Sequence, residues 1–75
     1  MDADRAKRAF GKAVRARRKA LKITQEELAH RAGVHPTYVG DVERGERNIA
    51  LINILKIAKA LGVKPGVLLT DAEVP

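Results

Sequence analysis

Apolar residues recur along this chain with the three- and four-residue spacing of helices, and no stretch alternates in the manner of a strand. The first such segment is predicted to be a helix from about Ala3 or Asp4 to Leu21, with Phe10, Val14 and Leu21 on one side. The pattern therefore predicts an all-α fold.

Residues 24–45 predict two short helices joined by a tight turn. Thr24 and Glu27 form a capping box, in which the hydroxyl accepts from an unpaired amide and the carboxylate reaches back to the cap. Gly33 ends the first of these helices, because glycine adopts a left-handed conformation at little cost. Pro36 suits the start of the second, whose apolar stripe is only two valines wide. A helix with so thin a buried face has most of its surface free to contact a partner.

The remainder of the chain predicts one longer helix and at most one short one. Asn48 is a favourable N-cap for a helix from about Ala50 to Leu61. The side chains expected to face the core from this helix are Leu51, Ile54, Leu55, Ala58 and Leu61. A short fifth helix is expected to open near Pro65 and reach Leu69, followed by a frayed tail at 70–75. Residues 1–75 are thus expected to form one domain, a compact five-helix bundle with its core in residues 8–69.

The net charge of +6 is unevenly distributed along the chain. Residues 1–22 hold nine Lys and Arg against two Asp, or +7, and residues 23–75 hold six against seven Asp and Glu, or −1. Positive charge concentrated on one element favours binding of a polyanion, either nucleic acid or acidic lipid. The alternative is a basic face that is only solvated.

Several classes of function are not expected. The absence of cysteine excludes disulfides and thiolate metal sites, and makes a reducing cytoplasm the expected location. His30 and His35 have no converging ligands, so no metal site is expected. The chain has no serine, Glu26 and Glu27 diverge around a helix, and no glycine-rich phosphate loop is present, so we expect neither an enzyme nor a cofactor. No membrane span or signal peptide is expected either.

A specific combination of residues covers about residues 8–69. It includes Phe10-Gly11, Ile23-Thr24-Gln25-Glu26-Glu27-Leu28-Ala29, Ala32-Gly33-Val34, Tyr38-Val39, Val42-Glu43-Arg44-Gly45 and Ile57-Ala58-Lys59-Ala60-Leu61-Gly62. This pattern resembles the prokaryotic lambda-repressor-like, or Xre/Cro-type, helix-turn-helix regulators. Residues 35–45 are especially similar to the small controller proteins of restriction–modification systems. The resemblance implies a homodimer that reads double-stranded DNA with its third helix, at half-sites roughly 34 Å apart.

The resemblance also implies which residues contact bases. These are His35, Thr37, Tyr38, Asp41 and Arg44. Thr contacts a thymine methyl group or hydrogen-bonds, and Asp accepts from a cytosine amino group. Two alternatives stay open: the Tyr38 ring packs against a neighbouring helix with its hydroxyl on a phosphate, or Asp41 only orients a neighbouring arginine.

Phosphate contacts are expected from Gln25, Tyr38, Arg47, Asn48 and Arg15. Gln25 opens a helix, where its amide and the free backbone N–H groups can meet a phosphate. The alternative for Gln25 is an ordinary solvent-facing residue at a helix start.

Arg18 and Glu43 belong to a different class of position. The resemblance pairs them in a buried ion pair between the first and third helices, so Arg18 is expected to be structural although it lies in a basic run.

Dimer contacts are expected from apolar residues near the end of the chain. The candidates are Ile49, Ile52, Pro65, Val67 and Leu69. The alternative is that they cap the core, but association stabilises a small domain that lacks disulfides or metals.

The expected function is an autoregulatory transcriptional regulator, a repressor or an activator, acting as a homodimer on a palindromic operator. No segment is left for a sensing domain, so no small-molecule ligand is expected. An activator would also contact RNA polymerase, with Glu46 as one candidate contact. The alternatives are an antitoxin that represses its own operon while holding a toxin, and a protein-interaction adaptor that uses the 24–45 face.

Overall fold

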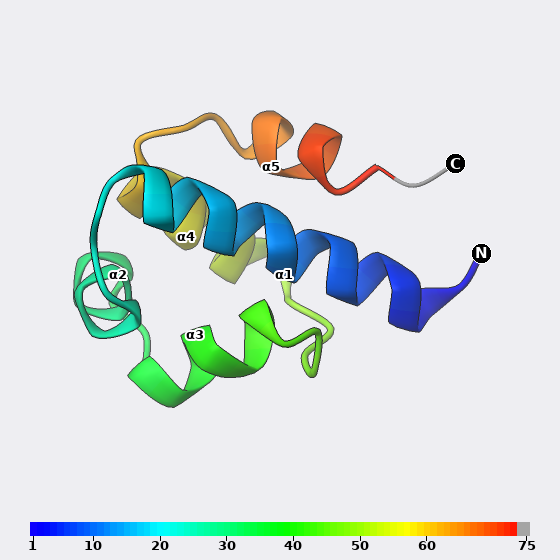
Figure 1. The fold of residues 1–75 in the computed structure, drawn as a ribbon, viewed down its shortest axis with the longest axis horizontal. Coiled ribbons are helices and arrows are strands. Elements are labelled where there is room, and N and C mark those ends of the chain that lie inside the picture. The colour runs from blue at the N-terminus through cyan, green and yellow to red at the C-terminus, as the bar shows by residue number, and fades with distance from the viewer. Residues whose placement is uncertain (74–75) are drawn as a thin grey trace.

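The computed structural model describes residues 1–73, which form five helices and no strand (Figure 1). The helices are α1 (Ala3–Ala20), α2 (Gln25–Ala32), α3 (Pro36–Glu43), α4 (Leu51–Leu61) and α5 (Pro65–Asp71). The predicted all-α fold is confirmed.

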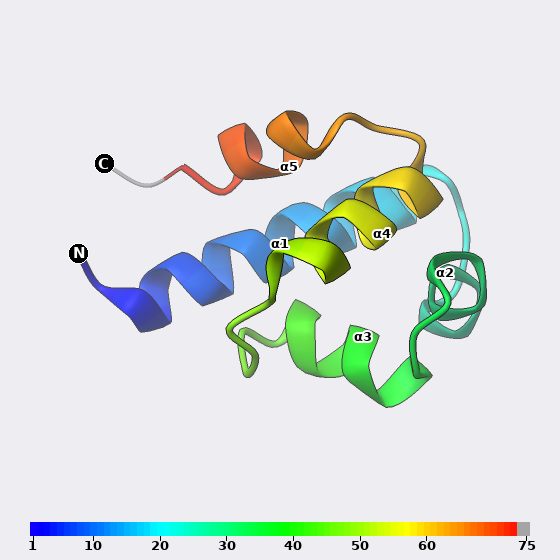
Figure 2. The same cartoon turned by 180° about the vertical axis from the view of Figure 1, so that it is seen from behind.

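The long helix α1 organises the other four. In Figure 1 it crosses the front of the molecule, with α5 above it and α3 below it. Figure 2 shows the reverse side, where α4 lies in front of α1. Helix α2 sits at one end of the molecule, and the start of α1 and the end of α5 lie at the other. The lower edge of the molecule in Figure 1 is thus formed by α3, which only α1 and α2 support extensively.

Local signals place the turn between α2 and α3 as the sequence predicts. Gly33 adopts a left-handed conformation with φ of 71°, and Pro36 is the first residue of α3. The Thr24 hydroxyl accepts from the Glu27 amide at 3.0 Å. The second half of the predicted capping box is wrong, because the Glu27 carboxylate instead accepts from Arg31 at 3.0 Å, one turn along α2.

The core consists of small aliphatic side chains around one phenylalanine. Its members are Phe10, Ala13, Val14, Leu28, Ala29, Ala32, Val39, Val42, Ile57, Ala58, Leu61 and Leu68. Gly11 allows α1 to lie directly on the end of α3, since a Cβ at this position would stand 2.6 Å from the Glu43 carbonyl oxygen. The backbone contact between α1 and α3 therefore depends on glycine.

Helix α4 starts within one residue of the prediction but departs from it in its N-cap and in its buried face. Ala50 is its N-cap and makes no side-chain hydrogen bond, so Asn48 does not cap it. Leu51 and Leu55, expected in the core, are 67% and 42% exposed, while Ile57 is fully buried. The apolar residues of α4 are spread over most of its circumference. Its hydrophobic pattern alone therefore does not identify the face that the other helices cover.

The two ends of the helical region also differ from expectation. Leu21 follows the last residue of α1 and is exposed rather than part of an apolar side. Helix α5 continues through Thr70 to Asp71, and the Asp71 carboxylate accepts from Arg17 at 2.9 Å. The predicted frayed tail is therefore wrong at 70–71, and residues 74–75 lie outside the described residues. Within residues 1–73, no helix is both long and apolar enough to cross a membrane.

Candidate nucleic-acid interface

A hydrogen-bonded network around Glu43 holds α3 against α1 and α2. The nearly buried Glu43 carboxylate accepts from Nε and Nη2 of Arg18 at 2.7 and 2.9 Å, and from Nε2 of Gln25 at 3.1 Å. Arg18 also donates through Nη1 to the Ile23 carbonyl at 2.9 Å. The hydrogen bonds to Glu43 raise the pKa of the Arg18 guanidinium above its ordinary value. The ion pair implied by the resemblance is present, and Gln25 is a third member that the sequence did not indicate.

The start of α3 presents polar groups to solvent. His35 is the N-cap, and its Nδ1 accepts from the Thr37 amide at 3.1 Å. His35, Pro36 and Thr37 are all exposed, whereas Val39 and Val42 on the opposite side are buried. This hydrogen bond satisfies one free amide of the first turn and fixes the His35 imidazole against the backbone of Thr37.

The end of α3 carries a cluster of charged side chains around Asp41. Its carboxylate accepts from Nη2 of Arg44 at 2.6 Å and from Nε of Arg47 at 3.2 Å. Arg44 also donates to Glu46 at 3.1 Å, and this hydrogen bond raises the pKa of its guanidinium. Asp41 thus positions two arginines, which is the alternative that the sequence left open, while its role as a base contact stays a prediction.

Tyr38 connects this cluster to α4. Its hydroxyl accepts from Nδ2 of Asn53 at 3.1 Å, and the Arg47 guanidinium lies 5.4 Å from the ring centroid. The ring is half-buried against the core, so it packs on the neighbouring helix. This contact between a cation and an aromatic face holds Arg47 beside α3, with the exposed Asn48 next to it.

Gln25 lies at an open depression between the starts of α2 and α3. The depression has a volume of about 500 Å³ and is lined by Arg18, Thr24, Gln25, Glu26, Pro36 and Thr37. The buried Gly40 lies under both Arg44 and Gln25, since a Cβ at that position would stand 3.1 Å from Nη1 of Arg44 and 3.4 Å from Oε1 of Gln25. Unpaired backbone amides at the start of α2 favour an anion near this end of the helix.

Arg15 is exposed on α1, on the side that meets α3. It follows Gly11 by four residues and precedes Arg18 by three, and both of these contact the end of α3. The candidate phosphate contacts therefore lie on two sides of α3, with Arg15 and Gln25 on one and Arg47 and Asn48 on the other.

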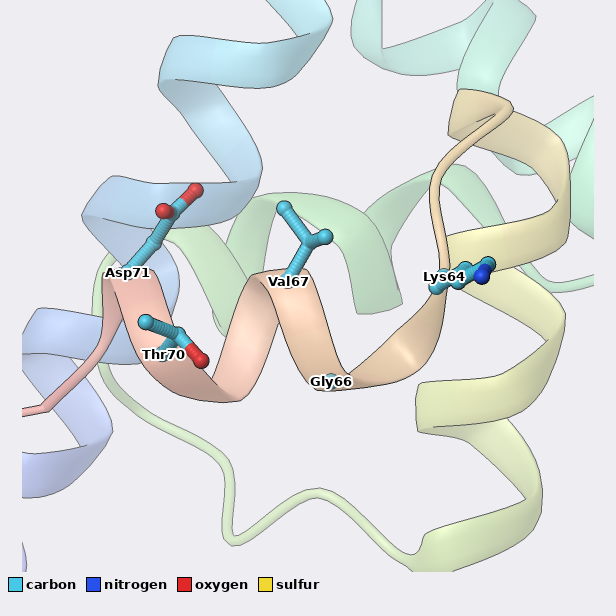
Figure 3. Close-up of a pocket in the computed structure, with 5 residues that line it drawn as sticks. All are labelled: Lys64, Gly66, Val67, Thr70 and Asp71. Carbon is cyan, nitrogen blue, oxygen red and sulfur yellow. The ribbon is translucent and has the colours of Figure 1, made fainter.

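The five candidate dimer residues do not form one surface. Ile49 and Leu69 line a common depression of about 180 Å³ beside Ile54. Figure 3 shows Val67 on the same side of α5 as Asp71, at a second depression that they share. Val67 and Leu69 are two positions apart on α5, so the two side chains point to nearly opposite sides of the helix. Leu69 is exposed, and Pro65 and Val67 are partly exposed.

The structure exposes two apolar residues that the sequence assigned to the core, Leu51 and Leu55, and they lie beside the candidate dimer residue Ile52. Leu51, Ile52 and Leu55 are all exposed and form what we call the α4 apolar stripe. Their exposure depends on which side of α4 the other helices cover, and no local signal in the sequence indicates this.

No group of three His, Cys, Asp or Glu side chains within residues 1–73 is placed to hold a metal ion.

Two helices joined by a glycine turn define a helix-turn-helix domain. The second helix is exposed along its outer side and is held by an ion pair whose side chains are 11% and 3% exposed. A family model described as helix-turn-helix matches residues 14–68. The chain belongs to this Xre-type helix-turn-helix family.

Similar proteins with known names are regulators. The control protein C.BamHI of Bacillus amyloliquefaciens is 51% identical over 57 residues, which are 75% of this chain and 70% of that protein. The crystal structure of the restriction-modification controller protein C.AhdI from Aeromonas hydrophila matches with a TM-score of 0.80 and 48% identity, over 81% of this chain and 92% of that one. The P22 c2 repressor protein in complex with a synthetic operator matches with a TM-score of 0.74 and 39% identity, over 79% of this chain and 89% of that one.

The chain is therefore a DNA-binding transcription regulator of the Xre/Cro type. Its family is made up of such regulators and not of enzymes.

Proposed function

We propose that this regulator binds a palindromic operator as a homodimer and controls transcription of its own gene, as a controller protein of a restriction–modification system. The observation that carries the proposal is the presence of two uncovered surfaces on one small domain. These are the exposed start of α3 and the α4 apolar stripe. The similarity to C.BamHI and C.AhdI supports the controller role.

In this proposal, His35 and Thr37 contact base edges from the start of α3, with Asp41 and Arg44 one turn further on. Asp41 is paired with two arginines, at 2.6 Å to Arg44 and 3.1 Å to Arg47. Arg44 can therefore turn toward DNA while Arg47 still neutralises the Asp41 carboxylate. The base contact of Arg44 then costs less than breaking an isolated ion pair.

Phosphate contacts complete the footprint on both sides of α3. Gln25 and Arg15 reach one strand, and Arg47 and Asn48 reach the other from the loop after α3. Tyr38 contributes by holding Arg47 over its ring, which is the supporting role that its hydrogen bond to Asn53 favours. Contacts of this kind set the register on the duplex, and base contacts set the sequence.

The proposed dimer interface is the α4 apolar stripe together with Leu69. A two-fold interface uses the same surface on both chains, so each of these leucine and isoleucine side chains is buried once in each chain. Burying one such side chain fully contributes about 1.5–3 kcal/mol. Ile49 supports this surface, since it lines the same depression as Leu69. Pro65 remains a candidate at its edge, and Val67 remains a candidate for a contact on the other side of α5.

The decisive experiment is selection of bound duplexes from a randomised DNA pool, followed by fluorescence anisotropy titration of the selected sequence. We expect a palindromic consensus whose half-sites lie about one helical turn apart, bound by a dimer in sedimentation velocity. Uniform, salt-sensitive binding with no consensus would contradict the operator-reading function. Substitutions of the candidate base contacts in α3 are compared in the same titration with Thr70→Ala. This control removes an exposed threonine hydroxyl from α5, away from α3.

Autoregulation is tested separately by transcription in vitro from a template that carries the gene's own promoter. A change in transcript level on adding the protein supports autoregulation, and its direction separates an activator from a repressor. An activator would also contact RNA polymerase. Glu46, exposed in the loop and held by Arg44, is the residue to substitute in that case. No change at any protein concentration contradicts autoregulation.

A further inference from the structure

Five basic residues of α1 lie along one side of the helix. Arg5, Arg8, Lys12, Arg15 and Lys19 follow each other at alternating intervals of three and four residues, and all five are exposed. Side chains at this spacing share one face of a helix. At 1.5 Å per residue, the row is about 21 Å long. We call this row the α1 basic stripe.

The charges of the α1 basic stripe are not neutralised within the part of the chain that the structure describes. The other three cations of α1, Lys7, Arg17 and Arg18, pair with carboxylates at 3.2, 2.9 and 2.7 Å. None of the five stripe residues has such a pair among residues 1–73. The three cations of α1 that lie close to carboxylates of the same chain are therefore neutralised, and the stripe is left free for an external anion.

The α1 basic stripe faces away from the core and to the side of α3. Lys12 is two residues from Phe10 and two from Val14, both buried, so it points nearly opposite to each. Gly11, which touches the end of α3, lies beside the stripe. Figure 1 looks at the molecule with α4 behind α1, onto the side of α1 that the other helices leave uncovered.

We propose that the α1 basic stripe, apart from Arg15 in the operator footprint, binds the phosphate backbone of duplex DNA outside the segment that α3 reads. In Figure 1, α3 lies below α1, so a straight duplex seated on the exposed side of α3 would not run along the uncovered side of α1. Flanking DNA that bends toward the protein reaches the stripe, and the new phosphate contacts offset the cost of bending. The inference rests on the DNA-binding function of the family and extends the proposed operator binding to the flanks.

Charge and context favour DNA over an acidic lipid surface. The stripe alternates with small residues such as Ala9 and Ala16, and it carries no large apolar side chain that would enter a membrane. Because α3 packs directly on α1, DNA bound by α3 places the flanking segments of the same duplex at a high local concentration near the stripe.

The test compares two variants that each remove three positive charges. Arg8→Gln/Lys12→Gln/Lys19→Gln neutralises most of the stripe and leaves Arg15 in place. The control, Arg31→Gln/Lys56→Gln/Lys59→Gln, neutralises exposed residues that line a depression between α2 and α4. All six side chains are exposed, and circular dichroism verifies that both variants are folded.

Each protein is titrated by anisotropy, at several salt concentrations, with a duplex trimmed to the selected operator and with one extended by about one helical turn on each side. We expect the wild-type protein and the control to bind the extended duplex more tightly. The stripe variant should lose that gain. On the extended duplex, its slope of log K against log salt should fall by about 2–3, because each phosphate contact contributes about 0.9.

Three results would overturn the proposal. Equal slopes for the stripe variant and the control would show that only net charge matters. An equal loss on trimmed and extended duplexes would place the stripe within the operator. Loss of binding to vesicles containing phosphatidylserine, with DNA slopes unchanged, would assign the stripe to lipid. If no protein prefers the operator to a scrambled sequence, the proposed operator function fails, and the slope comparison on the extended duplex still decides the role of the stripe.

Discussion

Replacing Arg18 by methionine tests the network that holds the recognition helix. Arg18→Met keeps an unbranched apolar side chain but removes the hydrogen bonds to Glu43 and to the Ile23 carbonyl. The Glu43 side chain is only 3% exposed and retains the neutral Gln25 amide as a partner. Leaving a buried carboxylate without its cation costs about 3–5 kcal/mol. A chain of 75 residues has a free energy of unfolding of about 4–11 kcal/mol, so this loss is a large share of it.

Urea unfolding followed by far-ultraviolet circular dichroism measures the effect. With an m-value of about 1–2 kcal/mol/M, the midpoint should fall by about 1.5–5 M. The double variant Arg18→Met/Glu43→Leu should be more stable than Arg18→Met, because it leaves no charge buried alone. Arg31→Met is the control, since it removes a pair whose side chains are 45% and 46% exposed and should cost less than about 0.5 kcal/mol.

Two outcomes would refute this reasoning. If Arg18→Met costs no more than Arg31→Met, the ion pair is effectively solvated. If the double variant is no more stable than Arg18→Met, an uncompensated carboxylate is not the cause of the loss.

Three further predictions concern packing, association and base reading. Gly11→Ala should lower the free energy of unfolding by about 1–3 kcal/mol or more, because its Cβ meets the Glu43 carbonyl oxygen 2.6 Å away. Gly66→Ala, with open space around it, should raise that free energy by about 0.4–1 kcal/mol, and equal effects in urea unfolding would contradict both expectations. Leu55→Glu should give a folded monomer in sedimentation velocity while Lys56→Glu stays dimeric, and an intact Leu55→Glu dimer would exclude the α4 apolar stripe. Thr37→Ala should change discrimination at one base pair of each half-site by about 1–3 kcal/mol in competition titrations, whereas a uniform loss on all sequences would remove it from base reading.

Local signals in the sequence were sufficient to predict the helix-turn-helix itself. Thr24, Gly33 and Pro36 act through their own backbone conformation and through amides within three residues, so the ends of α2 and α3 follow from the chain order alone. The same signals failed at Asn48, because the cap of α4 depends on how the preceding loop packs, and the helix begins after Ala50 instead.

The candidate site was predictable by position but not in its contacts. The resemblance to Xre-type regulators implied the pairing of Arg18 with Glu43 across 25 residues of sequence. The binding of Gln25 to the same carboxylate, and of Asp41 to Arg44 and Arg47, appears only when α2, α3 and the following loop are packed together.

The sequence alone determined the fold class, the position of the turn and the concentration of positive charge in residues 1–22, since these depend on neighbours along the chain. The tertiary structure alone decided which of the apolar residues of α4 are buried and which cations of α1 stay unpaired. Ile57 is enclosed while Leu55 is exposed, because the other helices cover only one side of α4. Arg17 is neutralised by a carboxylate 54 residues away while Lys12 is not, because α5 returns along only one side of α1. Such outcomes depend on contacts between distant segments, which hydrophobic periodicity and charge counts do not contain.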